Sequence, residues 1–346
     1  MKPIGQLGVV LMLLLSACSN SQISNSTNDS QKDIALFPVC KGEGIHNNYL
    51  DVQMDQTCKW GYIDTSGTLV IDYQFDMAFP FFEGLACVKV DNGTEGKWGY
   101  IDENGTFVIP PRFDQADKFS EGLARVEVEK RIGFIDKKGE MVVQPIWKNA
   151  FYMYSEGLVP VMNEDFEGNF GYIDNKGRMV IPPVFTDVDL FSEGLAAVAV
   201  GESNNCTYGY INKNGEFAIT PQFQSAVQFS EGLAAVKKDG VYGFIDKTGQ
   251  MMFTLPSRYY DDYWEAYPRW KMRSWLFKDG IVCINVQGSS FVNDVYDIYV
   301  DRNGKIIDTW SYLFTHPREA GRLYMEFQDG KMIYENSKWE IVWQER

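Results

Sequence analysis

One sixteen-residue phrase recurs along this chain. Residues 98–113 read WGYIDENGTFVIPPRF, and residues 170–185 read FGYIDNKGRMVIPPVF. A catalytic constellation is needed once per active site, whereas a phrase that returns at a fixed period is the signature of stacked structural units. The repeat therefore predicts an architecture before it predicts any chemistry.

The tetrapeptide D-x-x-G marks the period most clearly. Asp or Asn at its first position accepts a backbone hydrogen bond and Gly at its fourth takes a positive φ, as in a bulged type I β-hairpin. The pairs are Asp64 with Gly67, Asp102 with Gly105, Asp136 with Gly139, Asp174 with Gly177, Asn212 with Gly215, Asp246 with Gly249, and Asp301 with Gly304. The first six turns follow one another at nearly even intervals, as the units of a repeat protein do. Each copy is therefore predicted to be a hairpin, with a weaker eighth copy at 334–338.

Short segments rich in aromatic and β-branched residues flank each turn, such as W-G-Y-I before it and T-F-V-I after it, and such residues suit a pleated surface. Because proline cannot donate to a strand ladder, we expect the second strand to end at the prolines that follow. These are Pro110, Pro111, Pro145, Pro182, Pro183 and Pro221.

A third phrase, F-S-E-G-L-A-x-V or a close variant, precedes each hairpin and predicts another strand. The residue before its last valine varies among Cys87, Arg125, Pro160, Ala197 and Ala235, while the valine itself is the same in all five copies. This alternation predicts one buried and one exposed face. The three short antiparallel strands of a single period cannot bury a core alone, so we expect neighbouring units to stack.

Together these phrases resemble the WG repeat of bacterial proteins over nearly the whole chain after its N-terminal segment. In four copies another residue stands at the Trp position, namely Ile132, Phe170, Tyr208 and Tyr242. The resemblance implies an all-β tandem array and no fixed activity. We expect about eight three-stranded antiparallel units, in an open twisted solenoid or, as the alternative, a β-propeller-like ring. Residues 37–255 form the regular array, and residues 256–346 form degenerate repeats with an aromatic insertion.

The N-terminal segment predicts export and lipid anchoring. Lys2 precedes an apolar run over residues 7–15 that is too short to span a bilayer but fits a signal peptide. The sequence L-S-A-C that ends at Cys18 resembles the bacterial lipoprotein box, which implies a signal peptide at 1–17 and acyl chains on Cys18. Residues 18–36 are mostly polar and are predicted to be a disordered tether. The expected location is the bacterial cell envelope, on the periplasmic face of the outer membrane or the cell surface, with membrane contact through the lipid anchor only.

The net charge and the cysteine and histidine content argue against a nucleic-acid partner and against a metal site. The formal net charge of −15 argues against nucleic acid as a partner, since binding it needs a basic surface. The sequence has no C-x-x-C motif and only two histidines, His46 and His316, so we expect no metal site and no cofactor. Cys40 and Cys58 are the nearest cysteines in sequence and are the first candidates for a disulfide in an oxidising compartment.

The repeated polar and aromatic rows are interpreted as structural. The Asp residues are explained by their turns, and the Glu residues before Gly-Leu are expected to bond the backbone between units. The aromatic residues on either side of the WG glycine are expected to pack between units rather than to stack sugars.

One insertion breaks the period. The interval from Asp246 to Asp301 is much longer than any interval between the earlier turns, and residues 257–275 within it are rich in Tyr, Trp and Arg. Such residues dominate binding hot spots, although a plug that covers the array is the favoured interpretation. The candidate ligand-binding residues are Tyr263, Trp264, Tyr267, Trp270 and Arg273.

We therefore expect a non-catalytic module that binds an envelope protein or a glycan. The alternative is a carbohydrate-binding protein or carbohydrate-active enzyme with an aromatic groove.

Overall fold

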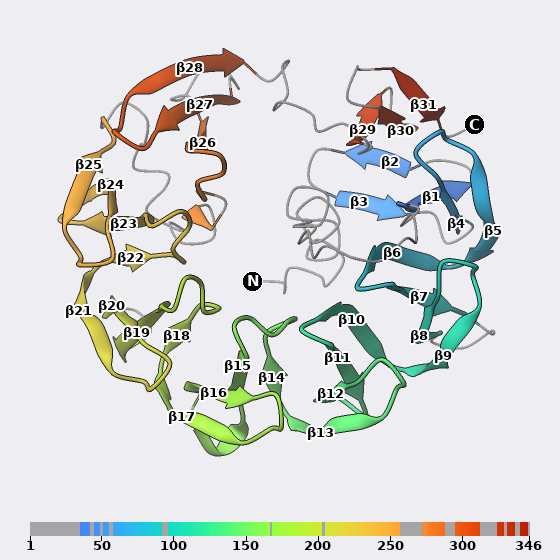
Figure 1. Cartoon of the computed structure of the whole chain (residues 1–346), viewed down its shortest axis with the longest axis horizontal. Coiled ribbons are helices and arrows are strands. Elements are labelled where there is room, and N and C mark those ends of the chain that lie inside the picture. The colour runs from blue at the N-terminus through green and yellow to red at the C-terminus, as the bar shows by residue number, and fades with distance from the viewer. Residues whose placement is uncertain are drawn as a thin grey trace, which may run out of the picture. The chain divides into compact units, whose positions relative to one another are not determined.

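The computed structural model describes residues 35–41, 45–48, 51–54, 58–91, 96–166, 168–202, 205–256, 272–273, 275–287, 295–311, 324–328, 331–335 and 340–344. These residues form eight small antiparallel sheets and one separate hairpin, which confirms the predicted all-β repeat fold (Figure 1). The chain divides into two compact units, residues 1–130, 134–141 and 315–346, and residues 131–133 and 142–314. The division falls within strands β12 (Arg131–Ile135) and β13 (Met141–Trp147) of the third sheet.

Five sheets have four strands each, in chain order. The second sheet contains β6 (Met77–Phe82), β7 (Leu85–Val90), β8 (Lys97–Ile101) and β9 (Phe107–Phe113). The third contains β10 (Gln115–Ser120), β11 (Leu123–Val128), β12 (Arg131–Ile135) and β13 (Met141–Trp147). The fourth contains β14 (Asn149–Ala150), β15 (Leu158–Met162), β16 (Phe170–Asp174) and β17 (Met179–Phe185). The fifth contains β18 (Asp187–Val188), β19 (Ala196–Glu202), β20 (Asn205–Ile211) and β21 (Phe217–Phe223). The sixth contains β22 (Ser225–Ala226), β23 (Ala234–Lys238), β24 (Val241–Ile245) and β25 (Met251–Thr254).

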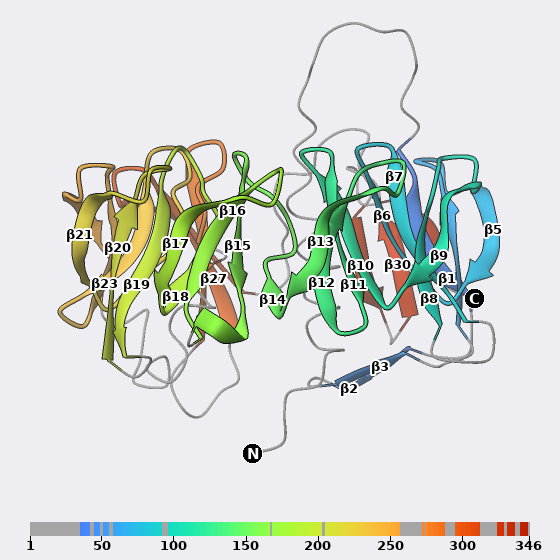
Figure 2. The ribbon, with the colours of Figure 1, turned by 90° about the horizontal axis from the view of Figure 1, so that it is seen from below.

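The sheets at the two ends of the chain have three strands each among the described residues. The first contains β1 (Phe37–Lys41), β4 (Lys59–Ile63) and β5 (Leu69–Phe75). The seventh contains β26 (Ile281–Gln287), β27 (Val295–Asp301) and β28 (Ile306–Ser311), and the eighth contains β29 (Tyr324–Gln328), β30 (Lys331–Glu335) and β31 (Ile341–Gln344). A hairpin of β2 (Ile45–Asn48) and β3 (Asp51–Met54) joins β1 to β4 and lies beyond their ends (Figure 2). A short 3-10 helix, η1 (Glu164–Phe166), follows β15.

The sequence predicted three strands per unit, and the five regular sheets have a fourth. The extra strand lies before the E-G turn, where β6 pairs with β7 and β10 with β11. In both pairs the register shifts within the ladder, between Ala78 and Phe81 and between Ala116 and Phe119. A bulge of this kind interrupts the period-two alternation of side chains, so the segment does not read as a strand in the sequence.

The prediction that the prolines end the second strand of each hairpin is wrong. Strand β9 continues through Pro110 and Pro111 to Phe113, and β17 continues in the same way to Phe185. Both are the last strands of their sheets, where a missing N–H costs no ladder bond.

The glycine of the WG phrase is required by the path of this outer strand. A Cβ on Gly209 would lie 2.6 Å from Ile219 O and 2.8 Å from Pro221 N, closer than real Cβ contacts come. The glycines at the same position in the other regular sheets also face outer-strand backbone at short distance. The repeated glycine therefore permits a close backbone approach at the register shift between the last two strands.

The predicted hairpin turns are confirmed. The glycines of all seven D-x-x-G turns have φ between 77° and 86°, and each donates its N–H to the carbonyl of the first turn residue. The first-position side chain accepts two further backbone N–H groups, as Asp102 does from Asn104 and Thr106.

The predicted exposed face of the E-G-L strand is wrong. Cys87, Ala197 and Ala235, which stand at its variable position, are at most 1% exposed. In β19 the residues of the two faces lie in different core clusters, Ala196 and Val198 in one and Ala197 and Ala199 in the other, so both faces of the strand are covered. A strand covered on both faces reads as a continuous apolar run rather than as an alternation.

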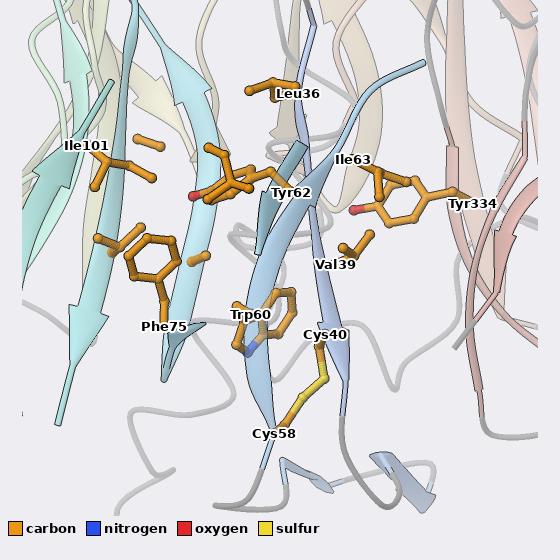
Figure 3. Packing of buried hydrophobic residues seen from close by; sticks show 14 residues of the cluster. Leu36, Val39, Cys40, Cys58, Trp60, Tyr62, Ile63, Phe75, Ile101 and Tyr334 are labelled. Carbon is orange, nitrogen blue, oxygen red and sulfur yellow. A yellow bond between two sulfur atoms is a disulfide. The ribbon is translucent and has the colours of Figure 1, made fainter. Parts of the chain in front are cut away.

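The eighth sheet packs against the first. Tyr334 of β30 is 1% exposed and belongs to the same core cluster as Val39, Trp60 and Tyr62 (Figure 3). Its hydroxyl donates to Pro38 O at 2.7 Å, and its ring lies 5.9 Å from that of Phe37. The eighth sheet therefore contributes a side chain to the core of the first sheet.

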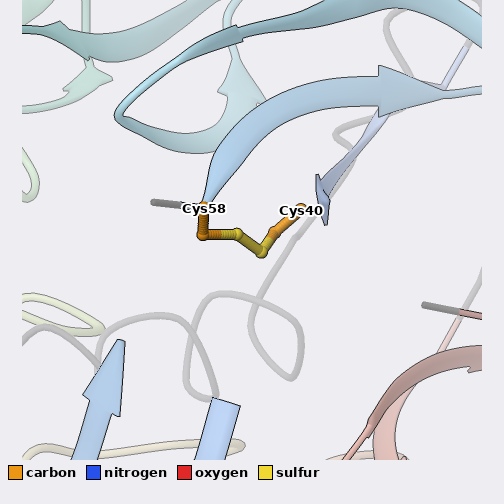
Figure 4. Close-up of a disulfide and its surroundings, with 2 residues drawn as sticks. All are labelled: Cys40 and Cys58. Carbon is orange, nitrogen blue, oxygen red and sulfur yellow. A yellow bond between two sulfur atoms is a disulfide. The ribbon is translucent and has the colours of Figure 1, made fainter. Parts of the chain in front are cut away.

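The predicted Cys40–Cys58 disulfide is present. It links β1 to the start of β4 at the base of the β2–β3 hairpin, with a Cα–Cα distance of 6.0 Å (Figure 4). Both cysteines are buried in the first core cluster.

Candidate functional site

The repeated tyrosine of the W-G-Y phrase joins four of the sheets, the first, second, fourth and fifth, to the sheet that follows. Tyr62, Tyr100, Tyr172 and Tyr210 donate their hydroxyls to backbone carbonyls 17 residues onward, each at 2.8 Å. All four side chains are fully buried, and burial raises the pKa of Tyr62 and of Tyr100 well above the usual tyrosine value. A buried, hydrogen-bonded ring offers no surface to a ligand, so this aromatic row is packing, as predicted.

The repeated glutamate makes a second inter-sheet contact, also as predicted. Glu193 accepts the N–H of Gly232 in the next sheet at 3.2 and 3.0 Å, and its carboxylate lies 3.1 Å from the ammonium of Lys247. Glu156 contacts Gly194 and Lys213 in the same way. Glu83 and Glu231 also bond the backbone of the following sheet.

A repeated serine supplies a third contact. Ser155, Ser192 and Ser230 donate their hydroxyls to carbonyls of the following sheet, at 2.6, 2.8 and 2.6 Å. In the second sheet Phe82 takes the place of this serine, and the ammonium of Lys118 lies 4.3 Å from the centre of its ring. A cation–π contact there replaces the hydrogen bond.

One charged pair near the E-G-L strand is specific to the third sheet. Arg125 donates to Asp117 at 2.7 Å, and both side chains are 18% exposed. Burial raises the pKa of Asp117 above the ordinary aspartate value, and the Arg125 guanidinium offsets part of that rise. In the sequence, Arg125 is the one charged residue at a position that Cys, Pro and Ala hold in the other copies. The sequence pattern predicts that this position is exposed, and the structure shows the Arg125 side chain mostly buried.

Of the predicted ligand-binding residues, Arg273 is described. Its guanidinium lies 3.9 Å from the Asp189 carboxylate and 6.0 Å from the centre of the Phe151 ring. Its neighbours Met272 and Trp275 are buried in a core cluster. These contacts fit the plug interpretation at this end of the insertion. Tyr263, Trp264, Tyr267 and Trp270 lie outside the described residues, and ligand binding by the five stays a prediction.

Other sequence predictions fall outside the described part of the chain or concern absences. Cys18 and the tether up to residue 34 are not described. Within the described ranges, no three His, Cys, Asp or Glu residues are grouped so that they could hold a metal ion. No helix in those ranges is long and apolar enough to cross a membrane.

The chain matches the family model described as WG containing repeat at residues 60–93, 98–131, 132–165, 170–202 and 208–242. No curated protein matches the sequence. Among solved structures, a eukaryotic initiation factor is 11% identical with a TM-score of 0.44, covering 82% of this chain and 81% of that one. Hsv2 of Kluyvelomyces marxianus is 9% identical with a TM-score of 0.39, covering 83% of this chain and 92% of that one. A putative TolB from Agrobacterium tumefaciens is 11% identical with a TM-score of 0.36, covering 60% of this chain and 83% of that one.

Each of the five family matches begins at the residue directly before the glycine that meets the outer strand. The matched period is thus the period of the sheets. This chain therefore contains tandem WG repeats.

Proposed function

We propose that this protein is a non-catalytic interaction module, tethered to the bacterial cell envelope by acyl chains on Cys18. The observation that supports it best is that the repeated polar side chains make their hydrogen bonds inside the array. The turn aspartates bond their own turns, and the repeated tyrosine, serine and glutamate bond the next sheet. The repeats build a scaffold, and binding falls to positions that depart from them.

Two features support the envelope location. The Cys40–Cys58 disulfide fits an oxidising compartment such as the periplasm or the cell surface. The lipoprotein-like sequence before Cys18 supplies an anchor that needs no membrane-spanning helix.

Anchoring is tested with a fatty-acid probe in cells that express the full chain. Cys18→Ser is expected to abolish labelling and to leave the precursor unprocessed. The matched control is Cys206→Ser, which removes a free, partly exposed cysteine of the fifth sheet and should leave labelling unchanged. Continued labelling of the Cys18→Ser protein would refute the anchor.

Partner binding is tested by cross-linking the full chain in envelope preparations and identifying the captured protein or glycan. A triple replacement of Trp264, Trp270 and Arg273 by Ala separates the two roles of the insertion. Loss of capture with an unchanged melting temperature indicates a binding surface, and loss of thermal stability indicates a plug. Release of sugars from an envelope polysaccharide by the purified protein would favour the alternative, a carbohydrate-active enzyme, over the proposed function.

A further inference from the structure

A shallow depression lies at the edge of the first sheet. It has a volume of about 540 Å³ and is lined by Lys41 of β1, Lys59 of β4, and Asp72 and Tyr73 of β5. Its residues come from all three strands of that sheet. The depression is open to solvent, which suits part of an extended ligand better than an enclosed small molecule.

Two of the four lining residues, Asp72 and Tyr73, depart from the repeat, whereas the lysine at the position of Lys41 recurs as Lys238 in the sixth sheet. In the outer strands of the next four sheets, proline stands at the position of Tyr73: Pro111, Pro145, Pro183 and Pro221. At the position of Asp72 those strands have Pro or an uncharged polar residue. Lys41 faces Lys59 across the β1–β4 ladder, whereas the corresponding pair in the second sheet is Val90 with Lys97.

The backbone does not require these departures, although the Tyr73 side chain packs partly against the first core cluster. Strand β5 has the same length and the same burial pattern as β9, β17 and β21, which carry proline at the fifth position. Its glycine, Gly61, faces outer-strand backbone as Gly99 does. In a repeat array, a residue that differs from its equivalents while the backbone stays the same is explained by something other than the backbone.

The charges of the depression balance. The ammonium of Lys59 is paired with Asp76 at 2.6 Å, and the second oxygen of Asp76 accepts the N–H of Asp91 at 2.7 Å. The ammonium of Lys41 lies 5.8 Å from the centre of the Tyr73 ring. Among the described residues, neither the Asp72 carboxylate nor the Tyr73 hydroxyl has a hydrogen-bond partner. The two ammonium groups, Lys41 and Lys59, are thus balanced by the carboxylates of Asp72 and Asp76, so the depression has no preference for a charged ligand.

We infer that this depression binds a segment of a neutral glycan. The exposed part of the half-buried Tyr73 ring, beside the Lys41 ammonium, offers an apolar surface against which a sugar ring can lie, and its hydroxyl is available for a hydrogen bond. The exposed carboxylate of Asp72 accepts hydrogen bonds from sugar hydroxyls, and the exposed ammonium of Lys41 donates to sugar oxygens. This inference rests on the proposed interaction function and names the ligand class for one surface.

The test is calorimetric titration of the full chain in detergent with three neutral hexasaccharides: cellohexaose, chitohexaose and maltohexaose. At least one is expected to bind. The informative variants replace a lining residue by its equivalent in other sheets, Tyr73→Pro and Asp72→Thr, which the fold already accepts at those positions. Each is expected to weaken binding about tenfold or more, as loss of a central aromatic or hydrogen-bonding contact does. The matched control is Thr220→Ala in β21, at the position equivalent to Asp72, which should leave binding unchanged.

Two results would overturn the inference. One is that none of the three hexasaccharides binds. The other is that Tyr73→Pro and Asp72→Thr bind the hexasaccharide as tightly as the wild type does and have the wild-type melting temperature. If either result is obtained and the full chain still captures a protein partner, the inference fails while the proposed interaction function stands. Failure to capture any protein or glycan would count against the proposed function itself.

Discussion

The glycine of the WG phrase gives the sharpest test of how the outer strand is held. Gly209 lies in β20 opposite Val198, and a Cβ there would meet the backbone at Ile219 O, Pro221 N and Thr220 C, at 2.6, 2.8 and 3.0 Å. Backbone atoms cannot rotate away as a side chain can. Gly209→Ala must therefore displace β21 or break part of its ladder with β20.

The sign of the effect distinguishes this explanation from an ordinary strand glycine. With free space, Gly→Ala inside a strand is stabilising by roughly 0.5–1 kcal/mol, because alanine loses less backbone entropy. Overpacking costs about 1–3 kcal/mol, so the close approach reverses the sign. We expect Gly209→Ala to lower the free energy of unfolding by about 1–2 kcal/mol.

The assay is urea unfolding followed by tryptophan fluorescence, with the slope compared among variants. Gly194→Ala is a comparison in which the cost has a different cause, since Gly194 has φ of +87° and a Cβ there would meet nothing within 4 Å. Its expected cost, about 1 kcal/mol, comes from the positive φ, which Gly209 lacks, so Gly209→Ala reports the close approach alone. A Gly209→Ala protein that is as stable as the wild type, or more stable, would refute the role assigned to this glycine.

Three further predictions follow from the inter-sheet contacts and the turns. Glu193→Gln keeps an acceptor for the Gly232 amide and loses only the partly exposed ion pair with Lys247, so it should lower the free energy of unfolding by less than about 1 kcal/mol. Glu193→Ala loses the acceptor as well and should cost about 1 kcal/mol more. Equal urea midpoints for the two variants would contradict this. Tyr334→Phe removes the buried hydrogen bond to Pro38 O and should speed amide hydrogen exchange in β1 and β30. Exchange in β20 should stay unchanged. If exchange in β1 and β30 is also unchanged, the hydrogen bond contributes little to stability. Hydrogen bonds from the side chains of Ser66 and Thr248 hold the pKa values of Asp64 and Asp246 below the usual aspartate value, so their stabilisation is present above that value and is lost as the pH falls through the lowered pKa. Asn at both positions should flatten the acid limb of a stability–pH curve, and an unchanged limb would contradict the shifts.

The sequence was sufficient for features that depend on one short segment. Asp102 and Gly105 specify their turn locally, because the side-chain acceptor and the positive φ both lie within the same short turn. The forward contact of the repeated glutamate was also predicted, since its recurrence has no local explanation. Cys40 and Cys58 were the nearest pair of cysteines in sequence, but the sequence left the connectivity open, and the structure supplies it.

Features that depend on a neighbouring strand or sheet were missed. Pro110 and Pro111 are compatible with β9 only because that strand is the last of its sheet, and the sequence does not say which strand is last. The prediction that Arg125 is exposed is wrong, because its partner Asp117 lies in β10, a strand that the local pattern did not predict. The candidate depression combines Lys41 of β1 with Tyr73 of β5, and the β2–β3 hairpin and β4 separate these strands in the sequence, so no single segment carries its signal.

The sameness of the inter-sheet contacts has a consequence for how the chain assembles. Glu156 and Glu193 meet the same partners in successive copies, a Gly amide and a Lys of the following hairpin, so one unit could equally dock on the wrong copy or on another molecule. Short connections between units favour the correct neighbour by raising its effective concentration. The first sheet differs, because Phe37 stands where the second sheet has Ala86 and contacts Tyr334 directly. That substitution gives the two ends a mutual preference that the internal copies lack, and it opposes intermolecular exchange of units.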